Sequence, residues 1–180
     1  QLLSQMESIS RQTIYDLQSH LSAELAEDYF GSATTFVATE IDQITRKAKI
    51  LSVGDSRAYL IDVQGNWQQI TQDHSILSEL LSDFPDKKEE DFATIYGGVS
   101  SCLVADYSEF QDKIFYQEIE IKQGESLLLC SDGLTDGLSA EVREKIWKQY
   151  DNDKSRLTVC RKLVAKQGFY DDLSVIICAF

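Results

Sequence analysis

Residues 127–136 read Leu-Leu-Leu-Cys-Ser-Asp-Gly-Leu-Thr-Asp, and this stretch decides the fold that we expect. A short apolar run that ends at turn-forming residues is typical of a buried strand. This run delivers Asp132 at once and Asp136 four residues later. A carboxylate at the end of a buried strand is costly without a partner, which would be a metal ion, a cationic side chain or a helix N-terminus. The alternative is that Ser131 or Asp132 only caps the helix that follows.

A second stretch places carboxylates at the start of an apolar run. Residues 171–178 read Asp-Asp-Leu-Ser-Val-Ile-Ile-Cys. If this strand and the strand from residue 127 are antiparallel neighbours, the end of one lies beside the start of the other. The sequence therefore predicts that Asp132 and Asp171 meet at one edge of a sheet.

A third stretch, residues 50–55, reads Ile-Leu-Ser-Val-Gly-Asp and would add Asp55 if its strand leaves at the same edge. Several carboxylates in one place repel each other unless a hard cation lies between them. No His or Cys accompanies them in a ligand pattern, which favours Mg²⁺ or Mn²⁺ over zinc.

Length and composition limit the classes of protein that remain. A chain of 180 residues with 43% hydrophobic and 26% charged residues is typical of one globular domain. A net charge of −13 argues against nucleic acid as a partner. No apolar run approaches the length of a membrane span, so we expect no membrane partner and a cytoplasmic location. The four Cys form no CxxC pair, which argues against a structural zinc site and favours reduced thiols.

The periodicity of the whole chain predicts an α+β domain built from antiparallel hairpins and helices. Gly31 is expected to stop the first helix, and Ser75 or Asp73 to cap the second. Helices are predicted for residues 1–27, from residue 76 onward, 139–150 and 154–167. Strands are predicted for residues 33–41, 48–53, 57–63, 67–70, 113–121, from 127 onward, and 173–180.

Five motifs, in this order along the chain, resemble the metal-dependent protein phosphatase (PPM) family, the type 2C serine/threonine phosphatases, and its bacterial branch most of all. The match begins with a small Gly-Ser-Ala-Thr-Thr element. The motifs are Gly-Ser-Ala-Thr-Thr (31–35), Gly-Asp-Ser-Arg-Ala-Tyr (54–59), Asp-His-Ser (73–75), Leu-Leu-Cys-Ser-Asp-Gly-Leu-Thr-Asp (128–136) and Asp-Asp-Leu-Ser-Val-Ile (171–176).

The resemblance implies an antiparallel β-sandwich with a helical layer on each outer face, an α-β-β-α arrangement. It implies a centre of two Mn²⁺ or Mg²⁺ ions, with Asp132 and Asp171 as ligands. Asp55, Asp132 and Asp136 match positions associated with a third, weaker metal in the family. It assigns no side chain as a catalytic nucleophile, and it leaves the substrate-binding residues open.

The implied activity is hydrolysis of phosphoserine and phosphothreonine in proteins, with a metal-activated hydroxide attacking phosphorus in line. The implied partner is a phosphorylated protein, such as the target of a kinase, and the implied process is signalling. The alternative is a catalytically inactive module with a phosphatase fold that regulates or binds.

One departure from the family pattern bears on activity. The family carries an Asp-Gly-x-Gly-Gly motif near its N-terminus, whose Asp bridges the two metals, and residues 1–180 contain no such motif. We therefore expect one phosphatase-like domain that lacks its N-terminal segment. A natural variant that has lost the site is the competing explanation. Hydrolysis by the chain alone is expected to be poor.

His74 and Arg57 are interpreted as structural residues. A His beside Asp would serve as a general acid, but an Asp-His pair more often closes a strand-to-helix turn through side-chain hydrogen bonds. Arg57 lies in the Gly-Asp-Ser-Arg match and is read in the same way. Tyr59, Trp67 and Tyr116 are expected to pack between strands.

Overall fold

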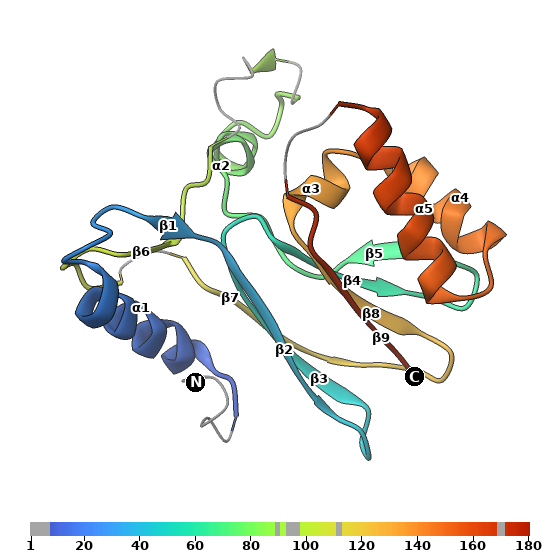
Figure 1. Ribbon diagram of the computed structural model, residues 1–180, viewed down its shortest axis with the longest axis horizontal. Helices are drawn as coiled ribbons and strands as arrows, with labels where there is room; N and C mark the ends of the chain where they lie inside the picture. Colours follow the sequence, from blue (N-terminus) through green and yellow to red (C-terminus); the bar gives the residue numbers. More distant parts are fainter. Residues whose placement is uncertain (1–7, 89–90, 93–97, 111–112, 169–171) are drawn as a thin grey trace. The chain divides into compact units, whose positions relative to one another are not determined.

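The computed structural model describes residues 8–88, 91–92, 98–110, 113–168 and 172–180 (Figure 1). The helices are α1 (Arg11–Leu25), α2 (Ile76–Asp83), α3 (Asp132–Thr135), α4 (Ala140–Gln149) and α5 (Asp153–Lys166). The strands are β1 (Ala33–Thr34), β2 (Phe36–Asp42), β3 (Lys47–Val53), β4 (Arg57–Ile61), β5 (Trp67–Gln69), β6 (Leu103–Val104), β7 (Phe115–Glu120), β8 (Ser126–Cys130) and β9 (Val175–Ala179). This mixture of helices and strands confirms the predicted α+β class.

The chain divides into two compact units. The first contains α1, α2, β1 and β6, and its ranges are Gln1–Glu40, Lys49–Asp55 and Gln72–Gln117. The second contains β4, β5, β8, β9 and α3 to α5, and its ranges are Ile41–Ala48, Ser56–Thr71 and Glu118–Phe180. The strands of the described residues pair in the orders β1-β6, β2-β3-β7 and β5-β4-β8-β9.

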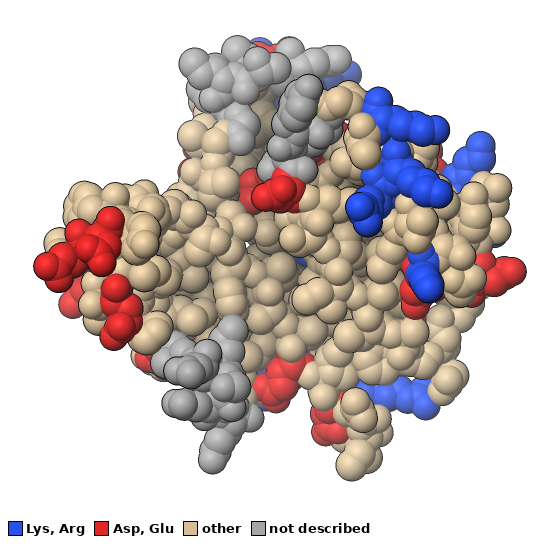
Figure 2. All heavy atoms as spheres, in the orientation of Figure 1, with Lys and Arg blue, Asp and Glu red and all other residues tan. Residues whose placement is uncertain are grey.

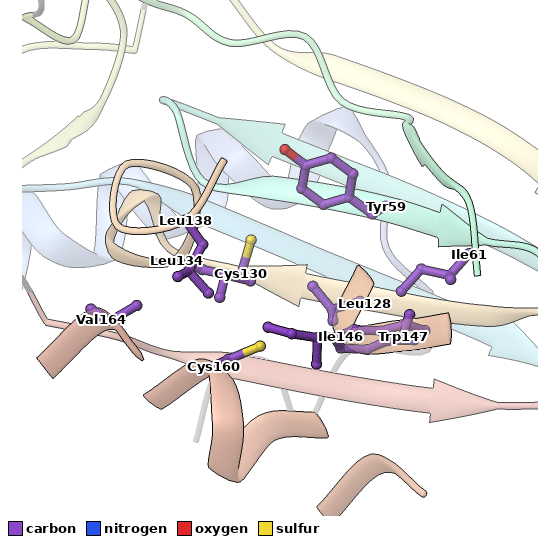
Figure 3. Packing of buried hydrophobic residues seen from close by; sticks show 10 residues of the cluster. All are labelled: Tyr59, Ile61, Leu128, Cys130, Leu134, Leu138, Ile146, Trp147, Cys160 and Val164. Atoms are coloured by element: carbon purple, nitrogen blue, oxygen red, sulfur yellow. The ribbon is translucent and has the colours of Figure 1, made fainter. Parts of the chain in front are cut away.

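The four-stranded sheet of the second unit is antiparallel throughout, as the hairpin pattern predicts. Its central strand β8 is buried from Leu127 to Cys130, on both alternating faces, which explains its unbroken apolar run. One face carries Leu128 and Cys130, which pack with side chains of α3, α4 and α5 (Figure 3). The helical layer over this face therefore fixes β8 and the motif that follows it.

The first unit has a separate core beneath α1. Ile14 is fully buried and packs with Leu51, Val53 and Leu103. The buried amide of Gln18 donates to the carbonyl of Val104 at 2.7 Å and accepts from its N–H at 3.1 Å. Because these bonds satisfy a polar side chain inside the core, α1 is fixed in register against β6.

Within the described residues, the first helix is shorter than the sequence predicts. Residues 1–7 lie outside the described residues, and the helix begins at Arg11, where the N–H of Ser10 donates to Thr13 Oγ1 at 2.9 Å. It ends at Leu25, because residues 27–31 are exposed and no buried face supports further turns. Gly31, with φ +81°, follows these turns and is not the residue that stops the helix.

Two predicted strands are also corrected. The strand expected over residues 33–41 is interrupted at Thr35, because β1 pairs with β6 whereas β2 joins β3 in another sheet. The strand expected over residues 57–63 ends at Ile61. There Asp62 Oδ1 accepts the N–H groups of Gln64 and Asn66, both at 2.9 Å, and so forms the turn early.

No helix within the described residues is both long enough and apolar enough to cross a membrane.

Candidate functional site

The end of β8 lies beside the start of β9, as the sequence predicts. Leu129 pairs with Ile176 and Cys130 with Val175 in an antiparallel register. One residue further, the N–H of Ser131 donates to the carbonyl of Ser174 at 3.1 Å. The two acidic motifs are thus brought to one sheet edge although about 40 residues separate them in the chain.

Ser131 joins the two motifs through its side chain. Its hydroxyl donates to the carbonyl of Asp172 at 2.9 Å and accepts the N–H of Ser174 at 3.0 Å. Ser131 occupies the N-cap position of α3, but its side chain makes no bond to that helix. The interpretation of Ser131 as a simple helix cap is therefore wrong, since its hydrogen bonds cross to the β9 segment.

Gly133 permits a close approach of the same two segments. It is buried in α3, and a Cβ built on it would lie 2.7 Å from the carbonyl oxygen of Asp172. No side chain fits in that space without movement of the backbone. The glycine and Ser131 together hold the backbone at Asp132 against the backbone at Asp172.

The carboxylates of Asp132 and Asp136 are carried by this fixed segment. Asp132 is half-buried at the first position of α3, and Asp136 is exposed at its C-cap. The N–H of Asp136 donates to the carbonyl of Asp132 at 2.8 Å, and Thr135 Oγ1 donates to the same oxygen at 3.1 Å. Residues four apart on a helical turn share one face, so both carboxylates project from the same side of this segment.

The described structure does not test the positions of the other two predicted ligands relative to this segment. Asp171 lies outside the described residues, next to Asp172. Asp55 is half-buried and belongs to the first unit, whereas Asp132 belongs to the second. The predicted meeting of Asp55, Asp132 and Asp171 stays a prediction.

The Gly54-Asp55 connection is fixed within the first unit. Gly54 has φ +101°, and a Cβ built on it would collide with the side chain of Thr35. Its N–H donates to Nδ1 of His74 at 3.2 Å, and its carbonyl accepts the N–H of His74 at 2.9 Å. These contacts agree with the structural interpretation of His74, which is buried and ties this turn to the start of α2.

The aromatic residues expected to pack between strands divide into two sets. Tyr59 is buried, and its ring lies 5.1 Å from that of Trp67, in the core of the second unit. Tyr116 packs against the core of the first unit and also lines a cavity of about 350 Å³ there. That cavity contains Glu79, whose pKa is lowered by hydrogen bonds from Ser100 and Lys113.

The donor chemistry of the 131–136 segment fits a hard cation. Its side chains offer carboxylate and hydroxyl oxygens, which Mg²⁺ and Mn²⁺ prefer. Within residues 8–88, 91–92, 98–110, 113–168 and 172–180, no group of three His, Cys, Asp or Glu is close enough to hold a metal ion. Asp171, the other ligand predicted for this segment, lies outside the described residues.

The cysteines are all free among the described residues, as expected for reduced thiols. Cys130 and Cys160 are buried, whereas Cys178 is half-buried on the edge strand β9. Burial raises the pKa of Cys160 to about 11, so this thiol is protonated near neutral pH.

Comparison with known proteins identifies the family to which this chain is similar. The family described as protein phosphatase 2C matches residues 1–158. The chain is 30% identical over 175 residues to the serine/threonine phosphatase stp of Listeria monocytogenes, an alignment covering 96% of this chain and 68% of the relative. It is 33% identical over 119 residues to the protein phosphatase PhpP of Streptococcus pneumoniae, covering 66% of this chain and 46% of the relative.

The family match and these relatives identify the class of this chain as the bacterial serine/threonine phosphatases of the PPM type. The chain belongs to the protein phosphatase 2C family. It spans about two thirds of the length of the Listeria relative and less than half of the Streptococcus relative.

Solved structures show the same fold. The serine/threonine phosphatase of S. agalactiae superposes with a TM-score of 0.79 at 21% identity, covering 94% of this chain and 69% of that one. The catalytic domain of PstP in complex with two manganese ions superposes with a TM-score of 0.69 at 24% identity, covering 91% and 65%. The predicted α+β sandwich is confirmed by this likeness.

Sequence reasoning missed the hydroxyl of Ser131 and the small residue at Gly133 as the contacts that hold the two motifs together. The signal available was a serine at the end of one apolar run and a second, Ser174, before the other. That pattern suggests a cross-strand bond only once the register of β8 and β9 is known.

Proposed function

We propose that this chain is the larger part of a metal-dependent protein phosphatase that hydrolyses phosphoserine and phosphothreonine in proteins. The observation that supports this most is the clamp between residues 131–133 and 172–174, which presents two acidic motifs at one edge of a sheet. Metal-dependent phosphoryl transfer requires carboxylates in fixed positions to hold its cations, because its catalysis is largely positioning and charge stabilisation.

Each residue has a defined part in this proposal. Asp132 and Asp171 would hold the principal cation, and Asp55 and Asp136 would contribute to a further, weaker site. Ser131 and Gly133 would keep the ligand-bearing backbone in place. When bound, Mn²⁺ or Mg²⁺ supplies Lewis-acid chemistry that polarises the phosphoryl group and activates water.

The remaining ligands are proposed to come from outside residues 1–180. A cation pair needs a carboxylate between its members, and the segment at α3 offers ligands for one side only. We therefore expect the chain alone to bind a second cation weakly and to hydrolyse phosphate esters slowly. We propose a cytoplasmic, signalling role, with a phosphorylated protein as the partner.

The test uses the natural protein that contains this chain. Phosphate release from a phosphoserine peptide is measured after removal of metal and again with millimolar Mn²⁺ or Mg²⁺. Asp132→Ala should lower the metal-dependent rate by several orders of magnitude. Asp151→Ala removes an exposed carboxylate of the same unit away from α3 and should leave the rate unchanged.

A second readout does not depend on turnover. Mn²⁺ should raise the melting temperature of the unaltered protein, because only the folded state assembles the ligands, and this shift should be lost in Asp132→Ala. A folded protein that stays inert with both metals would instead be a catalytically inactive module. Full activity in Asp132→Ala would show that the assigned site is wrong.

A further inference from the structure

The α4 and α5 helices carry an unusual share of the positive charge of an acidic chain. The chain has 17 Lys and Arg against 30 Asp and Glu. Eight of the 17 lie within these two helices: Arg143, Lys145, Lys148, Lys154, Arg156, Arg161, Lys162 and Lys166. In Figure 2 several blue side chains gather on the side where Figure 1 draws α5.

The charges on α5 form a stripe along its outer face. The exposed positions recur at spacings of three and four residues, as one face of a helix requires. These positions are Lys154, Thr158, Arg161, Lys162, Ala165 and Lys166, which we call the basic stripe. The opposite face, with Cys160 and Val164, is buried in the core of the second unit (Figure 3).

The cations of the basic stripe have no ionic partner in the part of the chain that the structure describes. Lys154, Arg161, Lys162 and Lys166 make no ion pair with any residue that the structure describes. The single acid of α5, Asp153, pairs instead with Arg156 at 2.8 Å. Four unpaired positive charges with no acid between them on one helix face are suited to a polyanionic partner.

The helix that bears the stripe packs against the candidate site. A Cβ built on Gly137, directly after Asp136, would meet Cγ2 of Val164 at 2.9 Å. Val164 also belongs to the same core cluster as Leu134 of α3. The basic stripe is therefore separated from the Asp132–Asp136 segment by about one helix diameter, roughly 10 Å.

We propose that the basic stripe of α5 is a docking surface for an acidic segment of the phosphoprotein substrate, outside the site of hydrolysis. This inference rests on the proposed phosphatase function for the identity of the partner. Lys154 to Lys166 spans about 18 Å along the helix. An extended peptide covers that length with five or six residues and needs about three more to cross from the site.

The composition of the stripe favours a protein partner over a membrane or a nucleic acid. A helix that lies on a membrane presents large apolar side chains beside its basic ones, and the stripe offers only Thr158 and Ala165 between its charges. A long nucleic acid would extend beyond 18 Å over a chain whose net charge is −13. A short acidic segment of a protein would contact only the cations of the stripe.

The test compares two phosphoserine peptides with the natural protein that contains this chain. In one, four glutamates begin four positions from the phosphoserine; in the other, glutamines replace them. The double variant Arg161→Gln/Lys162→Gln removes two charges of the stripe. Lys47→Gln/Lys122→Gln removes two charges of exposed lysines of the same unit outside α5 and serves as the control.

We expect the acidic peptide to have the lower KM for the unaltered protein. The stripe variant should raise that KM by about tenfold, near threefold per charge, at unchanged kcat. The glutamine peptide and the control variant should show no such change, and 0.5 M salt should remove the preference. Equal KM values for both peptides, or equal losses in stripe and control variants, would overturn the docking surface.

A binding measurement separates this inference from the proposed function. Anisotropy of a labelled tetraglutamate peptide without phosphoserine reports docking in the absence of hydrolysis. Salt-sensitive binding that the stripe variant loses supports the docking surface even if no peptide is hydrolysed, and then only the proposed function fails. Binding to anionic lipid vesicles but not to the acidic peptide would overturn the inference in favour of a membrane contact.

Discussion

Gly133→Ala tests the clamp on which the candidate site depends. The backbone at Gly133 is not in the left-handed region, so alanine is allowed there and would raise helix propensity by about 1 kcal/mol. Alanine is disfavoured by lack of space, because its Cβ would lie 2.7 Å from the carbonyl oxygen of Asp172, whereas ordinary contact begins at 3.4 Å. The two segments must therefore separate by about 0.7 Å or more.

That separation has two expected consequences. Crowding of this kind costs about 1–3 kcal/mol, and the gain in helix propensity offsets about 1 kcal/mol of it, so the free energy of unfolding should fall by up to about 2 kcal/mol. Displacement of Asp132 by a large fraction of an ångström should lower Mn²⁺-dependent kcat/KM by about 100-fold. Urea denaturation and hydrolysis of a small phosphate ester measure the two effects separately.

Gly124→Ala is the matched control. Gly124 has φ +83° in the turn before β8, at the other end of that strand from Asp132, so alanine there costs about 1–2 kcal/mol in stability. It should leave kcat/KM unchanged at temperatures where the protein is folded. If Gly133→Ala equals or exceeds the natural protein in stability and retains its metal-dependent rate, the clamp is not what positions Asp132.

Three further outcomes are expected. His74→Ala should lower the free energy of unfolding by about 1–3 kcal/mol, because the buried N–H of Gly54 loses its acceptor, and should leave the pH profile of hydrolysis unchanged; a lost basic limb would instead make His74 a general acid. The folded state holds the Cys160 proton up to a pKa of about 11, whereas the ordinary pKa of a thiol is 9.0, so the protein should lose stability as the pH rises from 9 to about 11. The urea midpoint should fall in that window, and Cys160→Ala should reduce the fall. The pKa of Asp62 is lowered by hydrogen bonds from Asn66, so its contribution to stability is present above its ordinary pKa of 3.8 and is lost as the pH falls through the lower folded-state pKa; in urea titrations Asp62→Ala should therefore lower the free energy of unfolding at pH 7 more than it does in acid.

The pairing of β8 with β9 was predictable because each strand is an apolar run that lies next to carboxylates in the sequence. Antiparallel neighbours place the end of one at the start of the other, and the register Cys130 to Val175 follows this rule. The end of α1 was not predictable from periodicity, since Leu25 continues the apolar spacing although it is 36% exposed. The change of sheet at Thr35 depends on the distant partner β6, which no local pattern signals.

The sequence was enough to predict the carboxylates of the candidate site, but not the contacts that hold them in position. Asp132 and Asp136 stand out as carboxylates after a buried strand, and the helix spacing between them follows from the sequence. The contacts that hold them are made by Ser131 and Gly133, and these depend on a backbone approach that no residue pattern encodes. Sequence reasoning therefore finds the charged groups, and the structure adds what keeps them in place.

The clamp also explains why α5 is free to carry a specialised outer face. Residues 131–133 and 172–174 are joined directly by hydrogen bonds and close packing, so their contact does not depend on the outer face of α5. What α5 must supply to the fold is its inner side, with Cys160 and Val164 in the core. Its exposed positions contribute little to stability, as is usual for surface residues away from caps and cores. The Lys and Arg residues on that side make no ion pair with the described residues, and in a chain of net charge −13 they are therefore better explained by a partner than by the fold.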